Sequence, residues 1–515
     1  MVKISVNVES PASSWITVSY SKASGDTGIT VDPQDSGIRV KAHSIGIIGA
    51  GPAGLASARV LLENGFTQIK VLERNNEIGG VWCYSPESRC HYNVPQESCN
   101  TAIRHNYDER SPSTGSYPTP LYDELHTNLP KDVMQFPGFP FPADTPEFPD
   151  RKQVQDYVRS YADTHGLRKV VKLNTHVLSI SYVNNQWQCI SRDLERQRTN
   201  TDYFDAMLVC TGRVSHPFIP DIPGLQELKE RNPEGMISAK EFRKASEYAG
   251  KNVMVVGGAF SAYDIARQLS FTTGKLHVSL PSRDNSNDDN DNDKDKDKDK
   301  DNKEPCFDGF DKSNLPVVHP VIKKVDTHLV YFADDSYMPL PDTIIFATGY
   351  LYSYPFIDNT NPLAMACSQV DPLQNVRCFT DGHNINDLYE YLVYIYNPSL
   401  AVFGVPFNVA PFPLYEHQAH FLAHLYKGEV KLPSFEEMKK MWEQLVRERP
   451  GKLLFKMGLE QIPYRNSLMD TIEKYVKDEC PTSRRLEYVT SDSMWAMRLK
   501  KPELHLQALG YGIKF

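Results

Sequence analysis

The chain has 515 residues, a formal net charge of −9 and nine cysteines. This length predicts two or three domains with ample cores, and the acidic charge argues against nucleic acid as a partner. An odd number of cysteines without a CxxC pair excludes a disulfide framework and a cysteine zinc site, so we predict no metal. No signal peptide and no apolar run long enough to span a bilayer are found, so we expect a cytoplasmic protein. A peripheral contact with the endoplasmic reticulum membrane and a homodimer are left open.

Residues 1–42 are rich in Ser, Thr, Val and Gly and show no helical period. We predict an N-terminal extension outside the main fold. Two alternatives are left open for it: a flexible tail or a small added β-element.

A glycine-rich turn follows an apolar run that begins at residue 45 and that we predict to be a buried strand. Its glycines are Gly49, Gly51 and Gly54, and a helix is predicted over 53–64. The first glycine allows a sharp turn, the second a close approach to a pyrophosphate, and the third close packing of helix on sheet. The helix N-terminus then faces the phosphates.

The next predicted strand, 68–72, ends at Glu73. A carboxylate at this distance from the turn can accept a hydrogen bond from a ribose hydroxyl. Strand, turn, helix and acid together predict a dinucleotide site.

The chain from 79 to 149 is rich in Pro, Tyr and Phe, which predicts a long irregular excursion over a cofactor. Asp150 and Gln153 form a capping-box pattern and predict a helix over 151–165. Short β-rich runs follow over 177–183 and 187–190.

A second glycine turn contains Gly257 and Gly258 after an apolar run and before a helix predicted to reach residue 269. A strand over 275–280 is followed by Arg283, whose guanidinium is suited to a 2′-phosphate. Two such turns predict two nucleotide sites, one for a 2′-phosphorylated cofactor. That Arg283 is only a solvated loop arginine is the alternative left open.

Residues 284–304 are almost only Asp, Asn and Lys. Such a run has no apolar surface to bury, so we predict a disordered acidic insertion.

A strand followed by Thr-Gly occurs twice, at 208–212 and at 342–349, each time after a glycine turn. The pattern predicts an α/β fold of two Rossmann-like dinucleotide-binding domains, the second inserted into the first. We place the first domain at 43–215 and 336–515, and the inserted domain at 216–335.

Several segments resemble the flavin-containing monooxygenase family. The run 77–82 resembles its GG-x-W element, and 122–141 resembles its Leu-x-Thr-Asn segment. The run 210–220 is similar to its F-x-G-x-x-x-H-x-x-x-(F/Y) signature without the two aromatic ends, and 347–350 and 397–404 fit its C-terminal part. The resemblance covers roughly 44–465 apart from the acidic insertion and is nearest to the fungal members.

The resemblance implies that FAD binds the first turn and NADPH the second. Reduced FAD then reacts with O2, and a flavin C4a-hydroperoxide passes one oxygen to a soft nitrogen or sulfur atom of a small-molecule nucleophile. Carried over by position, the FAD-binding residues are Gly49, Gly51, Gly54, Glu73, Val81 and Trp82. The NADPH-binding residues are Gly257, Gly258, Ser261, Ala262, Asp264 and Arg283.

Thr127 and Asn128 are expected between the flavin and the nicotinamide, and Asn128 is the catalytic residue that we predict. Its amide donates and accepts hydrogen bonds without a titrating proton. A turn-capping role before Pro130 is its alternative. Ala259 stands where the second turn usually has its middle glycine, which predicts weaker NADPH binding. His216 is expected to orient the two domains, with an acid or base role as the alternative.

Three rival functions are left open. A disulfide reductase needs a C-x4-C pair on a helix, whereas Cys83 and Cys90 have six residues between them, one of which is Pro86. A Baeyer–Villiger monooxygenase would carry a Trp-Pro ending that 218–220 lacks. The third is a flavin-binding protein without catalysis.

Overall fold

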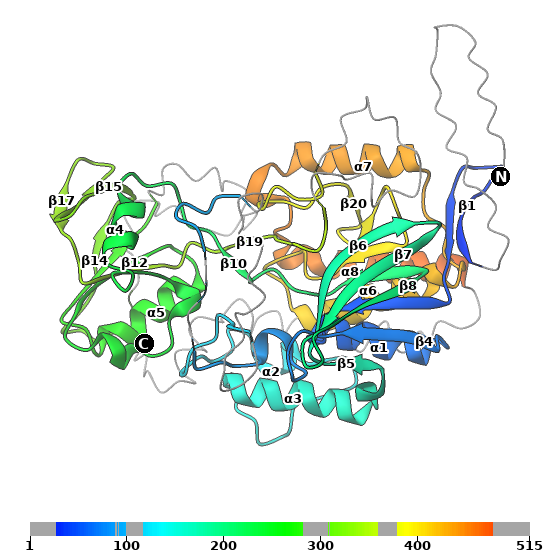
Figure 1. The fold of residues 1–515 in the computed structure, drawn as a ribbon, viewed down its shortest axis with the longest axis horizontal. Coiled ribbons are helices and arrows are strands. Elements are labelled where there is room, and N and C mark those ends of the chain that lie inside the picture. The colour runs from blue at the N-terminus through cyan, green and yellow to red at the C-terminus, as the bar shows by residue number, and fades with distance from the viewer. Residues whose placement is uncertain are drawn as a thin grey trace, which may run out of the picture.

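The computed structural model describes residues 27–87, 90, 92–98, 117–281, 307, 309–358 and 378–476. These form two lobes that lie side by side and are joined by thin connections (Figure 1). The larger lobe is built on a seven-stranded sheet with the order β20-β21-β22-β9-β3-β4-β5. The smaller lobe is built on a five-stranded sheet with the order β11-β18-β12-β13-β14. The predicted α/β fold with two Rossmann-like domains is therefore confirmed.

The larger sheet is parallel from β22 to β5, and its central strands are buried on both faces, as apolar runs predict. Its strands are β3 Ser44–Ile48, β4 Gln68–Leu72, β5 Val171–Lys172, β9 Ala206–Val209, β20 Leu388–Tyr389, β21 Val393–Tyr394 and β22 Leu400–Val402. The helices of this lobe are α1 Pro52–Glu63, α2 Lys131–Met134, α3 Arg151–Thr164, α6 Pro411–Tyr426, α7 Phe435–Glu448 and α8 Gln461–Tyr475.

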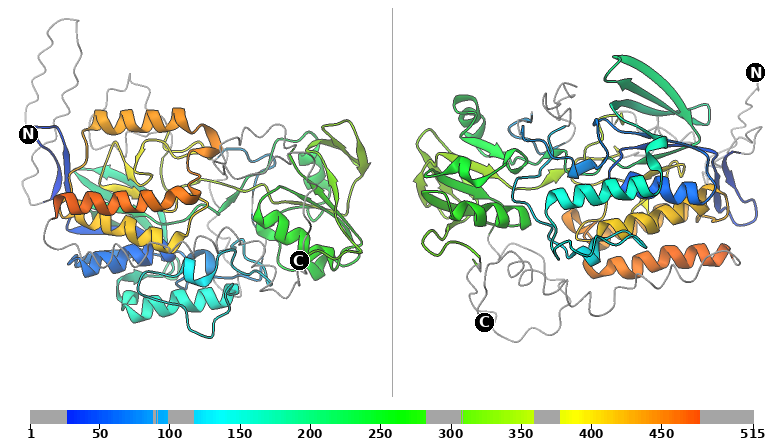
Figure 2. Two further views of the ribbon diagram at one scale, coloured as in Figure 1. Left: turned by 180° about the vertical axis from the view of Figure 1, so that it is seen from behind. Right: turned by 90° about the horizontal axis from the view of Figure 1, so that it is seen from below.

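Helices α1, α6 and α8 form layers on one face of the larger sheet, and a three-stranded antiparallel sheet lies on the other (Figure 2). That sheet comprises β6 Thr175–Val183, β7 Gln186–Asp193 and β8 Arg198–Phe204. The sequence predicted parts of β6 and β7, but β8 is polar and exposed and was not predicted. In the described part of the chain no helix is long and apolar enough to cross a membrane.

The helix predicted from the capping-box pattern is α3, which begins one residue after its cap. The Asp150 carboxylate accepts from the Gln153 amide at 2.8 Å, and the Gln153 side chain accepts from the Asp150 amide at 2.9 Å. Gly166, with φ of 61°, follows the helix end.

The described part of the N-terminal extension is a hairpin of β1 Gly28–Val31 and β2 Ile38–Lys41. Ile38 pairs with Leu432 in an antiparallel bridge, so the hairpin is attached to the connection between α6 and α7. The β-element is thus the correct alternative for this stretch.

The smaller sheet is wholly parallel. Its strands are β11 Met236–Ser238, β12 Asn252–Val256, β13 Lys275–Ser279, β14 Val317–His319 and β18 Thr343–Phe346. The lobe also contains α4 Leu225–Arg231, α5 Phe260–Ser270, and an antiparallel sheet of β15 Ile322–Val325, β16 Leu329–Phe332 and β17 Tyr337–Pro339. The predicted boundary at 335/336 is wrong, because β17 and β18 belong to this lobe.

Two antiparallel strands, β10 His216–Pro217 and β19 Tyr350–Leu351, lie where the chain enters and leaves the smaller lobe (Figure 1). The smaller lobe is therefore an insertion into the larger one.

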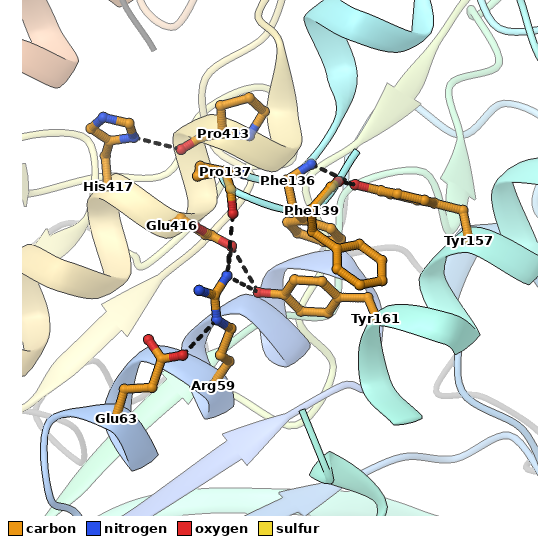
Figure 3. Close-up of polar contacts among 10 residues, drawn as sticks. All are labelled: Arg59, Glu63, Phe136, Pro137, Phe139, Tyr157, Tyr161, Pro413, Glu416 and His417. Carbon is orange, nitrogen blue, oxygen red and sulfur yellow. Dashed lines mark hydrogen bonds and ion pairs between the residues drawn. The ribbon is translucent and has the colours of Figure 1, made fainter. Parts of the chain in front are cut away.

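A buried polar network fixes α1 against α3 and α6 (Figure 3). Glu416 accepts from the Arg59 guanidinium and from the Tyr161 hydroxyl, both at 2.8 Å. Arg59 also pairs with Glu63 at 2.8 Å. The Phe136 ring stacks on Tyr161 with centroids 3.9 Å apart, so the loop after α2 joins the same network.

Candidate functional site

The first glycine turn is closely packed by backbone on three sides. Gly49 has φ of +103°, and a Cβ there would lie 2.7 Å from the Cys210 carbonyl oxygen at the end of β9. A Cβ on Gly54 would lie 1.9 Å from the Gly49 oxygen. Gly51 faces Gly80, and a Cβ on Gly80 would be 2.7 Å from the Gly51 Cα. Gly80 is thus required by its contact with Gly51, whereas a Cβ on Gly51 would lie 3.3 Å from the Gly80 Cα, a tight contact in addition to the predicted approach of a pyrophosphate.

The N-terminus of α1 suits an anion. Its first turn contains no acidic residue, and no side chain caps it. Its free amides and the helix dipole favour a phosphate group there. The residues present therefore fit FAD at this turn.

Glu73, at the end of β4, is buried with 4% exposure. Its carboxylate accepts from the amide of Ala50 at 2.7 Å and from the amide of Asn75 at 2.8 Å. Burial raises the pKa of this carboxyl, and the two amides oppose that shift. Glu73 therefore holds the glycine turn to the next strand, and its contact with a ribose stays a prediction.

Val81 and Trp82 lie in a short 3-10 helix, Gly80–Trp82, directly beside the first turn. Both are half-buried. Gly79 and Gly80 have φ of 142° and 59°, so the chain reverses here in a way that favours glycine. The structure brings these two predicted FAD residues to the same edge of the sheet as the three glycines.

The second glycine turn is open by comparison. Gly257 has φ of +134°, and a Cβ there would be 2.4 Å from the Ala347 oxygen. A Cβ on Gly258 would be no closer than 3.6 Å to any neighbour. Ala259 is the N-cap of α5, whose first turn has no acidic residue and no side-chain cap. Ser261 is exposed at this helix end, and Ala262 is buried against the sheet.

Asp264 lies one turn into α5, and its carboxylate is engaged by protein groups. It pairs with Arg267 at 2.7 Å and accepts from Gln268 at 3.1 Å. It also accepts a hydrogen bond from the hydroxyl of Tyr122, on the loop that runs from the core of the smaller lobe at Tyr122 to the core of the larger lobe at Leu129. The side chain thus joins this loop to α5, and a direct contact with NADPH stays a prediction. Tyr122 is the first residue of the run 122–141 that resembles the family's Leu-x-Thr-Asn segment, but the resemblance implies no role for it.

Thr127 and Asn128 lie five and six residues after Tyr122 on the same loop. Thr127 is buried and donates from its hydroxyl to the Leu129 carbonyl at 2.8 Å, while its amide donates to Pro149 at 2.9 Å. Asn128 is exposed, and its side chain makes no hydrogen bond with the described residues. Thr127 rather than Asn128 therefore holds the turn before Pro130.

Arg243 is a further residue of this region that no sequence pattern marked. It is 3% exposed and donates to the carbonyls of Ser85 at 2.8 Å and Phe242 at 2.9 Å. Arg243 thereby attaches the loop after Trp82 to the smaller lobe. An arginine in a polar stretch carries no local signal of such a role.

His216 is buried with 6% exposure in β10, the strand that links the lobes. This position agrees with an orienting residue at the domain connection. Arg283 and the acidic insertion 284–304 lie outside the described residues.

The cysteine pair required by a disulfide reductase is not formed. Cys83 and Cys90 form no disulfide with each other. Burial raises the pKa of the Cys83 thiol to about 12, so it is protonated at neutral pH and a poor nucleophile. Among the described residues no cluster of His, Cys, Asp and Glu could hold a metal ion.

Comparison with known proteins agrees with this geometry. The family model described as flavin-binding monooxygenase-like matches residues 109–286 and 313–482. The chain belongs to this family. A model for an NAD(P)-binding Rossmann-like domain also matches residues 47–107. The protein is therefore a flavoprotein monooxygenase with FAD and NADP(H) as its cofactors, as the resemblance implied.

The relatives cover most of the chain. A flavin-containing monooxygenase of the GS-OX-like group from Arabidopsis thaliana is 28% identical over 428 residues, which is 80% of this chain and 81% of the relative. The thiol-specific monooxygenase of Saccharomyces cerevisiae is 30% identical over 393 residues, or 74% and 76% of the two chains. The structure of S-allyl-L-cysteine S-oxygenase from Allium sativum superposes with a TM-score of 0.65 at 25% identity, and covers 92% of this chain and 98% of that one.

Proposed function

We propose that this protein is an NADPH- and O2-dependent monooxygenase that oxygenates a soft sulfur or nitrogen atom of a small molecule. The observation that carries the proposal is the loop from Tyr122 to Asn128. It is bonded through Tyr122 to α5, the helix of the second dinucleotide turn, and it continues to Leu129 in the core of the lobe that contains the first. One segment therefore links both cofactor turns.

FAD, when bound, accepts two electrons from NADPH and delivers them to O2. The balanced reaction consumes NADPH, a proton, O2 and substrate, and yields NADP⁺, water and the oxygenated product. The N-termini of α1 and α5 bind the phosphates of the two cofactors. The buried Thr127 turn holds the loop from Tyr122 to Asn128 in shape, and the Arg243 side chain holds the loop after Trp82 to the smaller lobe.

Sulfur is the favoured nucleophile. Two relatives support it by name: one is a thiol-specific monooxygenase and one an S-oxygenase of S-allyl-L-cysteine. No specific observation in this chain favours a Baeyer–Villiger reaction. A homodimer and a peripheral membrane contact stay predictions.

The experiment is a reaction in two stages. Anaerobic NADPH is expected to bleach the yellow flavin, and admission of ¹⁸O2 with a thioether is expected to give a sulfoxide that contains one ¹⁸O atom. NADH in place of NADPH is the control for coenzyme choice. A flavin that NADPH cannot bleach, or a product without ¹⁸O, would contradict the proposal.

Asn128→Ala tests the assigned catalytic residue. Its neutral amide is proposed to hydrogen-bond the reacting oxygen at the flavin. The variant is expected to bind FAD and to be reduced by NADPH at the parent rate, while product per NADPH falls about 100-fold and H2O2 rises in its place. Asp132→Ala, four residues away at an exposed position of α2, is the matched control. Parent-like coupling in Asn128→Ala would refute the assignment.

A further inference from the structure

Arg213 lies at the edge of the larger sheet where the first dinucleotide turn lies. It follows Gly212, three residues after Cys210, whose carbonyl oxygen contacts the Gly49 turn. Ligands of open α/β sheets bind outside the carboxyl ends of the strands, and β9 ends here beside β3. The proposed function assigns no role to this cation.

The Arg213 side chain is surrounded by aromatic groups from separate segments. Its guanidinium carbon lies 5.2 Å from the ring centroid of Phe407, in the connection between β22 and α6. The hydroxyl of Tyr352 interacts with it and also donates to the Val405 carbonyl at 2.7 Å. The charge of Arg213 also acts electrostatically on the hydroxyls of Tyr354 and of Tyr415, which lies on α6. A half-buried arginine is thus held in place without help from an acid.

The three phenols cannot neutralise the arginine. Burial raises the pKa of Tyr415 to about 12 and also raises the pKa values of Tyr352 and Tyr354, so all three are uncharged at neutral pH. In the described part of the chain no carboxylate lies within ion-pair distance of Arg213. By contrast, Arg59 and Arg267 are each paired with a carboxylate of the protein.

A cation held by uncharged aromatic groups is suited to an anionic ligand. Its planar guanidinium carries five N–H donors, and stacking on a ring occupies its face but leaves its edge available. A pair of negatively charged oxygens matches that edge. The desolvation cost of a half-buried charge is offset once such a ligand binds.

We propose that Arg213 is the anion-recognition residue of the active site and binds a planar, negatively charged oxygen acceptor beside the flavin. This chemistry is offered by the carboxylate of an acidic thioether substrate and by the pyrimidine edge of reduced FAD. The inference rests on the proposed function, since it takes the first turn as the flavin site. It adds a preference for an anionic ligand that the glycine turns do not explain.

The test compares Arg213→Met, Arg213→Lys and the parent with two probes, 3-(methylthio)propanoate and its uncharged amide. Binding is measured by the change in the visible spectrum of bound FAD, without turnover. If the substrate carboxylate is the ligand, Arg213→Met is expected to weaken binding of the carboxylate by about 10- to 100-fold and to leave the amide unchanged. Arg213→Lys keeps the charge without the fork, so an intermediate loss is expected.

If reduced FAD is the ligand, Arg213→Met is expected to shift the midpoint potential of bound FAD to a more negative value, with equal effects on both probes. Arg196→Met, an exposed arginine on the turn after β7, is the control and should change neither quantity. A stable Arg213→Met protein with parent-like probe selectivity and parent-like potential would overturn the proposal. If Arg213→Met loses FAD, Arg213→Gln gives the same comparison. Loss of FAD in all three variants, including Arg213→Lys, would assign Arg213 to structure and also overturn it.

Both readouts need only bound flavin. A parent protein that fails to oxygenate thioethers would therefore refute the proposed function, while the spectra and the potential would still decide the role of Arg213.

Discussion

The two glycine turns share one pattern but differ in how closely the protein surrounds them. In the first, a Cβ on Gly54 would overlap the Gly49 oxygen at 1.9 Å, and the adjacent Glu73 is buried with 4% exposure. In the second, a Cβ on Gly258 meets nothing within 3.6 Å, and Ser261 is exposed. The first turn is thus closely packed at all three glycines, whereas the second is packed at Gly257 and open at Gly258 and Ser261.

This difference matches the two cofactors. A prosthetic flavin stays bound through every cycle, so its turn can be built into the core. NADPH must enter as a substrate and leave as NADP⁺, which an exposed helix end allows. Ala259 and Ala262 stand in the second turn where the first has Gly51 and Gly54. Ala259 is exposed, which explains why its methyl group is tolerated, whereas the methyl group of Ala262 is buried in the core of the smaller lobe.

The largest expected effect comes from placing one methyl group in each turn. Gly54→Ala places a Cβ against backbone, which cannot move aside, so destabilisation beyond about 5 kcal/mol and loss of bound FAD are expected. Gly258→Ala places a Cβ 3.6 Å from the Leu280 Cδ2, an ordinary van der Waals contact, so its unfolding temperature should stay at the parent value. Thermal unfolding and flavin content check both variants. Parent-like flavin content in Gly54→Ala would show that the turn is not tightly packed.

The second comparison concerns the arginines that follow each turn. Arg59→Met leaves Glu416 buried without its cation, which is expected to cost about 3–5 kcal/mol. Burial raises the pKa of Glu416 to about 7 even beside Arg59. Without Arg59, the pKa of Glu416 in the folded variant should be higher than in the parent. The free energy of unfolding of the variant should therefore fall more than that of the parent as pH rises from 6 to 8.

Arg267→Met is the matched change in the smaller lobe. Asp264 keeps its contacts with Tyr122 and Gln268 and has 18% side-chain exposure, so a smaller loss is expected. Denaturant unfolding at pH 6 and pH 8 measures both. Equal losses in the two variants would contradict the view that the first turn is the more closely packed of the two.

The local parts of this architecture could be predicted from the sequence, because their signals are local. The two glycine turns, the strand 68–72 and the capping box at Asp150 each depend on residues within one or two turns of chain. The segment around Thr127 and Asn128 was found by resemblance to a family, since no periodicity marks it.

The long-range parts could not be predicted, because partners distant in sequence decide them. Thr343–Phe346 is an apolar run that suits either sheet, and only its pairing with β11 and β12 places it in the smaller lobe. The hairpin at 28–41 is attached near Leu432. The bond from Tyr122 to Asp264 joins residues distant in sequence, and neither residue type signals it in isolation.

The third comparison is between a buried histidine, His417, and an exposed one, His328. Burial lowers the pKa of His417 in α6 to about 4, with Arg465 adding to the shift. Because the pKa of His417 is lower in the folded protein, the unfolded chain takes up a proton at this residue at a higher pH than the folded protein does. The stability that it contributes is therefore present above pH 6.5 and lost as pH falls toward 4, by at most about 3 kcal/mol. His417→Gln should flatten this acid limb, and His328→Gln, at an exposed site, should not. Denaturant unfolding at pH 7, 5.5 and 4.5 checks it; an unchanged acid limb would remove His417 as its cause.

The smallest expected change in stability comes from the Tyr122 hydroxyl, which joins the loop before Thr127 to α5. Tyr122→Phe removes the hydrogen bond to Asp264 while keeping the ring contact with Phe242, at 5.5 Å between centroids, and is expected to cost about 1.5 kcal/mol. FAD content should stay at the parent level, because the first turn is untouched. Reduction of FAD by NADPH should slow several-fold, because the loop that carries Asn128 is no longer fixed to α5, whereas reduction by dithionite should keep its parent rate. Stopped-flow reduction with the two reductants separates these effects. Equal slowing with both would place the defect in the flavin turn, and no slowing with NADPH would show that Tyr122 is not needed to align the two cofactors.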